Sequence, residues 1–496
     1  MGNNWTATEI QSLVRHLGSW SLGKGSLQQK LARALTQAVR NGFLIPGSRL
    51  PSERTLARAL MLSRTTVVAA YDVLREAGWL ESRSGSGTWV CARSTGVAAA
   101  RSAARDAALN QSPLFNLLGP RDSEDRLDFA LGTPLPLEEL PMELFTIPPG
   151  EYAAMVRDRH YYPLGLATLR RALARMFSQD GLETTEEQVL ITNGAQAAIS
   201  LCAALYVQRG DTVLVEDPTY FGALDAFRTA DARMTMLPVG PHGVAPAMIR
   251  ERIKNTAARL VYLTPTFQNP TGSVMPAAAR KELGKIVSES GVPVVDDGAL
   301  ADLALDGPAP PPLAASAPQA AFLTIGSLSK LAWPGLRVGW VRAPAWIIER
   351  LARLKSSLDL ASPLLTQAIA VRIVEDIERL RRLRRAQLKP RRDLLATLLG
   401  KRLPEWTFRV PSGGLCLWVK LPHGDARELA QVALRHGVIL LPGPLASAMG
   451  RYESYLRIPF LAEPETLRTA VHRLATAWKD YQSNARPQRE QPLVVV

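Results

Sequence analysis

Residues 327–330 of this chain are Ser-Leu-Ser-Lys, and residues 334–340, which follow closely, are Pro-Gly-Leu-Arg-Val-Gly-Trp. The amine of Lys330 can hold an aldehyde as a Schiff base. The nearby hydroxyls and the guanidinium of Arg337 can neutralise a phosphate. Together these groups suit an aldehyde cofactor that carries a phosphate tail, and they indicate which fold to expect around them.

Outward from this stretch, four short apolar runs alternate with helical stretches. They are residues 212–215, 260–263, 292–295 and 322–325. The alternation is typical of an α/β fold with a mainly parallel sheet. In such sheets the ligand groups stand on loops at the strand ends, which is where the candidate cofactor residues fall.

Further motifs stand at these strand ends. Residues 192–196, Thr-Asn-Gly-Ala-Gln, precede an apolar helix whose first backbone amides could bind a phosphate. Tyr220 could stack on a flat ring, Asn269 offers an amide to a ring oxygen, and Asp296 could pair with a protonated pyridine nitrogen. Packing, a turn and a helix cap would explain these three residues singly. Their occurrence together, in order with Lys330, favours a cofactor site.

These motifs resemble the fold-type I aminotransferases that use pyridoxal 5′-phosphate, across roughly residues 127–481. Further matches are Tyr161-Tyr162-Pro163-Leu164-Gly165, Gly413-Gly414-Leu415 and Tyr455-Leu456-Arg457. The resemblance implies the fold of that family, with pyridoxal 5′-phosphate as cofactor and Lys330 bound to its aldehyde.

The resemblance also implies individual roles. Asp296 binds the ring nitrogen, Asn269 binds the ring hydroxyl, and Tyr220 stacks on the ring. Arg457 holds a substrate carboxylate. The phosphate is assigned to Gly194, Ala195, Gln196, Ser327, Ser329 and Arg337, with Tyr161 reaching in from a second subunit. A homodimer is therefore expected.

One departure from the aminotransferase pattern follows Asp296. In that family a tyrosine usually stands two or three positions after the ring-nitrogen aspartate, whereas here the next residues are Asp297-Gly298-Ala299. We therefore expect altered basicity at the lysine and leave open whether the chain supports transamination.

The first ninety residues have a different character. Apolar residues recur at helical spacing over 27–39, a second helix is predicted to begin at Ser52, and a third is predicted to be capped by Ser63. The predicted buried stripe of the third helix consists of Val67, Tyr71 and Leu74. Two β-prone runs flank Ser84-Gly85-Ser86-Gly87, which predicts a hairpin. Three helices and a hairpin describe a winged helix-turn-helix.

Three stretches of this segment, residues 46–57, 63–67 and 85–88, resemble the GntR family of winged-helix regulators. The resemblance implies contacts to double-stranded DNA, with the start of the third helix in a major groove. The implied DNA-binding residues are Ser52, Arg54, Arg64, Thr65 and Thr66, with Gly85 and Ser86 at the wing tip. Residues 1–92 hold eleven Lys and Arg against five Asp and Glu, so 11 − 5 gives +6.

Composition sets the outer limits. The chain of 496 residues is long enough for two or three domains, and its formal charge of +14 favours a polyanionic partner. Three scattered cysteines, without metal-ligand spacing, argue against a disulfide framework and a zinc site. The longest apolar stretch, near 197–207, is too short to cross a bilayer, and we expect a cytoplasmic protein without a membrane partner.

Composition also suggests the boundaries. We expect a winged-helix domain over 1–92, a flexible linker over 93–126, an aminotransferase-like domain over 127–482 and a disordered tail over 483–496. The basic run from Glu378 to Arg392 is interpreted as a solvated helix face, with a DNA contact as the alternative.

A GntR-type winged helix linked to an aminotransferase-like domain resembles the MocR/GabR subfamily of bacterial regulators. The resemblance implies a pyridoxal-phosphate-dependent transcriptional regulator whose effector is an amine, an amino acid or the cofactor itself. Two alternatives stay open. One is a working aminotransferase with an accessory DNA-binding domain, and the other is a DNA-binding protein whose large domain is a cofactor-free scaffold.

Overall fold

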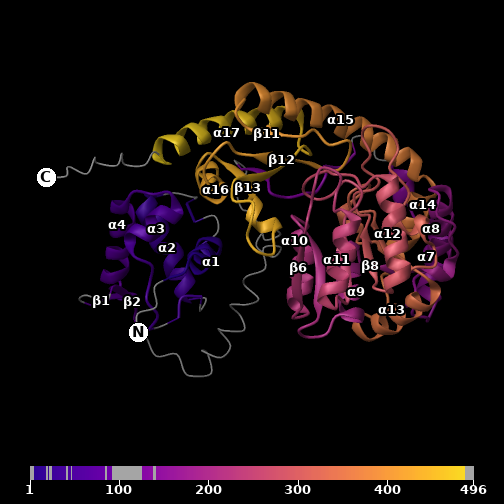
Figure 1. Ribbon diagram of the computed structural model, residues 1–496. Helices are drawn as coiled ribbons and strands as arrows, with labels where there is room; N and C mark the ends of the chain where they lie inside the picture. Colours follow the sequence, from indigo (N-terminus) through magenta and orange to yellow (C-terminus); the bar gives the residue numbers. More distant parts are fainter. Residues whose placement is uncertain are drawn as a thin grey trace. The chain divides into compact units, whose positions relative to one another are not determined.

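The computed structural model describes residues 5–17, 20–21, 25–40, 43–45, 47–83, 87–91, 126–137 and 141–485. The predicted linker, except for Arg126, and the wing-tip residues Gly85 and Ser86 lie outside this part of the chain. The chain divides into two compact units, and Figure 1 labels the helices and strands along the sequence. The first comprises Met1–Asp128, His423–Leu440 and Ala470–Val496, and the second comprises Phe129–Pro422 and Leu441–Thr469.

The amino-terminal elements are four helices and a hairpin: α1 (Ala7–Leu17), α2 (Leu27–Arg40), α3 (Glu53–Leu60), α4 (Arg64–Glu76), β1 (Leu80–Arg83) and β2 (Gly87–Val90). Helix α3 begins directly after Ser52, which caps it, and Ser63 caps α4 as predicted. The predicted stripe of α4 is buried. Helix α1 was not predicted, although the reciprocal bonds between Thr6 and Glu9 form a capping box that the sequence contains.

The larger sheet has seven strands, in the order β4-β10-β9-β8-β7-β5-β6. All neighbours are parallel except β10, which is antiparallel to both β4 and β9. The predicted, mainly parallel α/β sheet is thus confirmed. The strands are β4 (Val189–Thr192), β5 (Thr212–Asp217), β6 (Arg233–Pro238), β7 (Leu260–Leu263), β8 (Val294–Asp297), β9 (Phe322–Ser327) and β10 (Gly339–Arg342).

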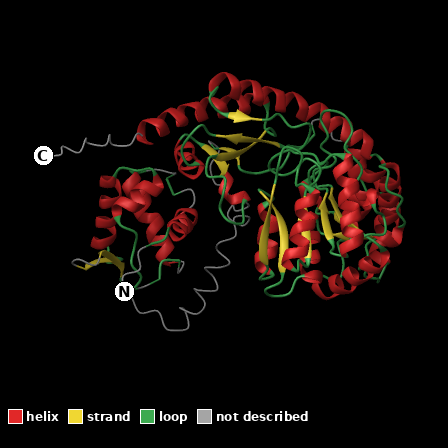
Figure 2. Ribbon diagram, in the orientation of Figure 1, coloured by secondary structure: helices red, strands yellow, loops and turns green. Residues whose placement is uncertain are grey.

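Helices cover both faces of this sheet (Figure 2), and each face has its own apolar core. One core contains residues of α8, α11, α12 and α14, and the other contains residues of α9, α10 and α13. The helices of this unit up to α14 are α7 (Pro149–Arg157), α8 (Ala167–Gln179), α9 (Ala195–Tyr206), α10 (Phe221–Thr229), α11 (Pro246–Thr256), α12 (Ala277–Ser290), α13 (Ala345–Leu358) and α14 (Leu364–Glu375). Short 3₁₀ turns span Met142–Phe145, Glu186–Gln188, Leu313–Ser316, Pro334–Leu336 and Gly443–Ala446.

A second sheet has the order β11-β12-β14-β13-β3. Its strands are β3 (Leu127–Phe129), β11 (Thr407–Phe408), β12 (Cys416–Lys420), β13 (Val438–Pro442) and β14 (Tyr455–Pro459). The remaining helices are α15 (Ile377–Arg402), α16 (Ala426–Arg435) and α17 (Pro464–Ala485). Helix α17 extends to Ala485, so the first three residues of the tail predicted over 483–496 are helical. No helix in the described residues has both the length and the apolarity that a membrane span requires.

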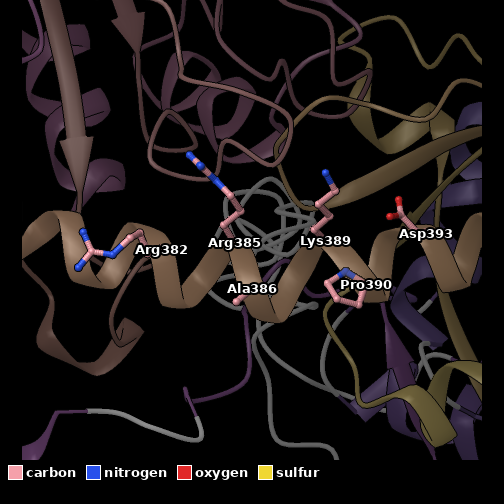
Figure 3. Close-up of a pocket in the computed structure, with 6 residues that line it drawn as sticks. All are labelled: Arg382, Arg385, Ala386, Lys389, Pro390 and Asp393. Carbon is pink, nitrogen blue, oxygen red and sulfur yellow. The ribbon is translucent and has the colours of Figure 1, made fainter.

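The basic run on α15 is built into the fold. Arg384, Arg391 and Arg392 are buried, so the predicted solvated face is wrong for these residues. Arg381 pairs with Asp180 and Asp302 at 2.8 and 2.7 Å. Figure 3 shows the side of α15 that lines an open groove, with residues Arg382, Arg385, Ala386, Lys389, Pro390 and Asp393. The buried arginines act as cationic anchors for neighbouring segments.

Candidate functional site

The turn at the start of α9 forms one end of the candidate site. Gly194 caps this helix with a φ of +86°, in the left-handed region that favours glycine. A Cβ atom on Gly194 would lie 2.9 Å from Nη2 of Arg337, so the guanidinium packs directly on this turn. The same Nη2 donates to Asn193 O at 2.8 Å. Backbone amides at a helix start beside a cation make a favourable site for a phosphate.

Strand pairing brings the Ser327 turn to the same place. Gly339 on β10 stands opposite Thr192 on β4 and opposite Ser327 on β9. A Cβ atom on Gly339 would lie 2.8 Å from Cα of Gly194, so a glycine is needed for this close approach. Ser327 Oγ lies 3.0 Å from Ser329 Oγ. The structure thus brings together the predicted phosphate residues Gly194, Ala195, Ser327, Ser329 and Arg337.

Lys330 follows directly. Its side chain is partly exposed by surface area, yet its amine is enclosed by protein atoms. Burial first, and then the positive charges of Arg457 and Arg337, lower the pKa of this amine to about 8. A lysine with such a pKa has a sizeable neutral fraction near neutral pH, and the neutral amine is the nucleophile. The predicted lysine and the two predicted arginines therefore share one site.

Tyr220, at the start of α10, faces the same group of charges. Burial, and then the carboxylate of Asp297, raise the pKa of its phenol to about 12, while Arg457 and Arg337 act in the opposite direction. The ring packs against the core that contains α9 and α10. Asp297 is thus the carboxylate with the larger influence on Tyr220, ahead of Asp225.

Asp296, the predicted partner of the ring nitrogen, lies on the opposite face of the sheet. Its Oδ2 accepts from the backbone N–H of Leu313 at 2.9 Å. Val294 belongs to the core with α8 and α12, whereas Val295 belongs to the core with α9 and α10. Because neighbours on a strand point to opposite faces, Asp296 shares the face of Val294 and Asp297 shares that of Val295. The strand faces therefore argue against the prediction for Asp296, because Asp297 and not Asp296 lies on the face of the sheet where Tyr220 packs.

Asp297 is held firmly on its face. The phenol of Tyr262 donates to its Oδ2 at 2.5 Å, and Ala299 N donates to its Oδ1 at 3.0 Å. Burial raises the pKa of this carboxyl. Counted from Asp297, the positions two and three further on are Ala299 and Leu300, so the family's tyrosine is missing from either starting point.

Gln268 joins two loops of the site, and the sequence interpretation missed it. Its Nε2 donates to Glu216 Oε2 at 3.1 Å and to Pro218 O at 2.6 Å, on the loop that leads to Tyr220. Its Oε1 accepts from the backbone and hydroxyl of Thr271, at 3.0 and 2.7 Å. Asn269, the next residue, is half-buried on the same loop. The sequence offered no signal for this bridge, because a lone glutamine before a turn is common.

Glu216 is part of this bridge. It is fully buried at the end of β5, and burial raises the pKa of its carboxyl to about 7, although the bonds from Gln268 and Thr264 oppose this shift. A buried carboxyl with such a pKa changes its charge near neutral pH. The bridge between the two loops therefore contains a titratable group.

Arg457, the predicted carboxylate ligand, lies on β14 opposite Trp418 of β12. It is buried, and its Nη2 donates to Ala130 O at 2.6 Å. A Cβ atom on Gly132 would lie 3.5 Å from the same Nη2, so the segment after β3 runs beside the guanidinium. Tyr161, in contrast, is 72% exposed within this single chain.

The residues fit pyridoxal 5′-phosphate. The glycine turn under Arg337 leaves room that a Cβ atom would fill, and it carries the donors that a phosphate requires. Nε2 of Gln196 donates to Gly222 O at 2.8 Å beside the Tyr220 ring. Within the described residues, Oε1 of Gln196 and Oγ1 of Thr219 are buried without a hydrogen-bond partner. The Lys330 amine, the Asp297 carboxylate and the Tyr220 ring supply the attachment, charge-pairing and stacking groups that the cofactor needs.

The second candidate site is the start of α4. Ser63 Oγ accepts from Thr66 N at 3.1 Å and shares hydrogen bonds with the hydroxyls of Thr65 and Thr66, at 2.7 and 2.8 Å. The side chains of Arg54 and Arg64 are exposed. In the described part of the chain, neither guanidinium has a hydrogen bond or an ion pair. The first turn of α4 thus presents the exposed cation of Arg64 beside hydroxyl groups that share hydrogen bonds with Ser63.

Ser52 has a structural task that the DNA-binding prediction did not include. Its Oγ accepts from Thr55 N at 3.1 Å and lies 2.7 Å from the hydroxyl of Thr55. As the N-cap of α3 it fixes the entry of this helix. Its exposed position still allows contact with a ligand.

Comparisons with known proteins support both the aminotransferase-like domain and the winged-helix domain. Residues 151–474 match the family Aminotransferase class I and II, and residues 27–90 match Bacterial regulatory proteins, gntR family. The HTH-type transcriptional regulator YisV of Bacillus subtilis (strain 168) is 31% identical over 81% of this chain and 86% of its own length. The probable rhizopine catabolism regulatory protein MocR of Rhizobium meliloti is 28% identical over 77% of this chain and 78% of its own length.

A solved structure resembles the aminotransferase-like domain. It is LysN, the α-aminoadipate aminotransferase of Thermus thermophilus, complexed with N-(5′-phosphopyridoxyl)-L-leucine. The match has a TM-score of 0.66 and 31% identity, and it covers 73% of this chain and 94% of that one. With the family matches and the relatives above, it shows that this chain belongs to the MocR-type regulators of the GntR family, in which a winged helix-turn-helix is joined to an aminotransferase class I and II domain.

Proposed function

We propose that this regulator holds pyridoxal 5′-phosphate at Lys330, binds an operator through the start of α4, and changes its operator affinity when an amine or amino acid enters the cofactor site. The observation that carries the proposal is the enclosed amine of Lys330 beside Arg337, Arg457 and Tyr220. An amine with a pKa of about 8 is prepared for covalent attachment to an aldehyde.

In this proposal the cofactor phosphate would be held at the glycine turn of α9 by Arg337, Gly194, Ala195, Gln196, Ser327 and Ser329. Tyr220 stacks on the ring and Asn269 contacts the ring hydroxyl. Asp297 replaces Asp296 as the partner of the ring nitrogen, because it shares a face with Tyr220. When bound, the cofactor supplies an electrophilic carbon that can exchange one amine for another.

Arg457 supplies recognition of the effector. Its guanidinium now binds a neutral backbone carbonyl, Ala130 O. A carboxylate is a stronger acceptor than a carbonyl for a guanidinium. We therefore propose a carboxylate-bearing amine as effector: Arg457 would bind its carboxylate, and its amine would compete with that of Lys330 for the aldehyde of the cofactor.

The DNA side rests on Arg54, Arg64, Thr65 and Thr66 at and near the start of α4, with Ser52 as a further contact. Dimers of winged helices bind two half-sites, and the exposed Tyr161 is proposed to complete the cofactor site of a second subunit. A coupling between the two sites requires that the effector bind two states of the dimer with different affinity, by about 1–3 kcal/mol in typical cases.

The test begins with the absorption spectrum of the purified protein after addition of pyridoxal 5′-phosphate. The wild type and the control Lys389→Ala are expected to gain a visible band and a borohydride-reducible adduct, whereas Lys330→Ala gains neither. Amino acids and amines are then screened for a change in this band, and any hit is tested for its effect on operator binding. Rapid multiple turnover with a keto acid, without any effect on DNA binding, would support the working aminotransferase instead.

A further inference from the structure

Arg384 on α15 holds the segment that directly follows Lys330. Only 1% of this residue is exposed. Its Nε and Nη2 both donate to Leu331 O, at 3.0 and 2.8 Å, and Nη2 also donates to Ala332 O at 3.1 Å. Three N–H donations from one rigid, planar guanidinium thus fix two successive carbonyl groups. These carbonyls belong to the two residues after the lysine.

The same guanidinium reaches a second segment. Its Nη1 donates to Leu135 O at 2.7 Å and to Gln387 Oε1 at 2.6 Å, and Gln387 Nε2 donates to Pro136 O at 3.0 Å. Residues 130–136 are therefore bound at one end by Arg457, through Ala130 O, and at the other end by α15. One buried arginine connects the lysine turn with the segment beside the predicted carboxylate ligand.

Burial of the Arg384 charge is unfavourable for the stability of the fold. Among the described residues, its guanidinium donates to carbonyl and amide oxygens and to no carboxylate. Burial, and then the charge of Arg391, lower the pKa of its guanidinium to about 10. A buried cation without an acidic partner costs desolvation energy that an apolar side chain of similar size would not cost. The hydrogen bonds of Arg384 are therefore better explained by the fixed position that they give to the segment after Lys330 than by a contribution to stability.

We infer that Arg384 is a positioning residue for Lys330: by fixing the carbonyls of Leu331 and Ala332, it sets where the amine stands relative to the glycine turn of α9. The inference rests on the proposed function, because it concerns how Lys330 meets pyridoxal 5′-phosphate. Arg384 is absent from the charges that shift the pKa of Lys330. Its effect is therefore on the place of the amine and not on its protonation.

The experiment compares Arg384→Met with Arg391→Met in the full-length protein. Arg391 is a matched control, since it lies on the same helix, is also buried, and donates to Leu461 O at 2.9 Å and to Glu463 at 2.6 Å. The measured quantity is the rate at which the cofactor-free protein captures pyridoxal 5′-phosphate. In this step Lys330 Nζ forms a C=N bond to the aldehyde carbon and one water leaves. Borohydride trapping and intact mass report the adduct, and circular dichroism reports the orientation of the bound cofactor.

Arg384→Met is expected to capture the cofactor about 10- to 100-fold more slowly, because a displacement of about 1 Å can cost about 100-fold in rate. The pH at which its rate reaches half-maximum stays that of the wild type, and the circular dichroism of its bound cofactor changes. Arg391→Met is expected to lose thermal stability but to capture the cofactor at the wild-type rate. Arg384→Lys keeps the charge but cannot donate three hydrogen bonds in one plane. Its capture rate is expected to lie between those of the wild type and Arg384→Met.

Capture by Arg384→Met at the wild-type rate, with an unchanged dichroism signal, would overturn the inference while the proposed function stands. An equal slowing in Arg391→Met would also overturn it, because the effect would then come from general destabilisation. If Arg384→Met does not fold, Arg384→Lys decides the question by the same rate and signal. A wild-type protein that captures no cofactor would overturn the proposed function, and this inference with it.

Discussion

Replacement of Arg457 by methionine is expected to shift the pH dependence with which the cofactor-free protein captures pyridoxal 5′-phosphate. Burial is the largest cause of the lowered pKa of Lys330, and the charges of Arg457 and Arg337 follow. Removal of one of these positive charges stabilises the protonated amine. The pKa of Lys330 should therefore rise, and the pH of half-maximal capture should rise with it.

The magnitude follows from the pKa of about 8 in place of the usual 10.5. At pH 7.5 about a quarter of the Lys330 amines are neutral, whereas an ordinary lysine would be neutral in about one molecule per thousand. The capture rate should rise about tenfold per pH unit below this pKa and level off above it. In Arg457→Met the whole curve should move to higher pH.

The same shift affects stability. The pKa of Lys330 is lower in the folded than in the unfolded protein. Its contribution to the unfolding free energy is therefore fully present above about pH 10.5 and is lost as the pH falls through about 8. The wild type without cofactor should lose up to about 3 kcal/mol of unfolding free energy through this group, and Lys330→Met should not. Denaturant titration at pH 7 and pH 10 measures this difference.

Stopped-flow absorbance from pH 6.5 to pH 10 measures the capture rate, with exposed Arg468→Met as the control for loss of a positive charge. A small amine-reactive reagent serves as a second probe, because the ionisation of the cofactor does not affect its reaction. A wild-type midpoint near 10.5 would refute the reasoning about burial. Equal midpoints in the wild type and Arg457→Met would refute the assigned influence of Arg457.

Three further predictions concern other parts of the chain. Asp297→Asn should weaken cofactor binding in equilibrium dialysis far more than Asp296→Asn, whose main effect should be on stability; the reverse order would contradict the strand faces described above. Gln268→Ala should lower both cofactor affinity and, by about 1–3 kcal/mol in denaturant titration, the unfolding free energy, since Glu216 and Pro218 O lose a buried donor. Arg64→Ala should leave the cofactor band unchanged and weaken operator binding, as measured by fluorescence anisotropy. Loss of a base contact should cost about 1–3 kcal/mol of binding free energy, whereas loss of a phosphate contact should reduce the slope of log affinity against log salt concentration by about one. Unchanged affinity would remove Arg64 from the interface.

Local signals in the sequence were enough for much of the fold. The start of α3 at Ser52, the cap at Ser63 and the apolar stripe of α4 depend on neighbours within a few residues, so the helix-turn-helix could be predicted. The apolar runs gave the parallel sheet, and the order of motifs around Lys330 gave the family. Helix α1 was also within reach, because its capping box is a local pattern.

Tertiary structure decided what depends on which side of an element faces which layer. Strand alternation states that Asp296 and Asp297 face opposite ways, but only the packing of α9 and α10 on one face reveals which of them meets Tyr220. Likewise, an arginine in a basic run has the same sequence signature whether it is solvated or buried. Arg384 is buried because the fold brings the carbonyls of Leu331 and Leu135, distant in sequence, to one guanidinium, and no local pattern contains that contact.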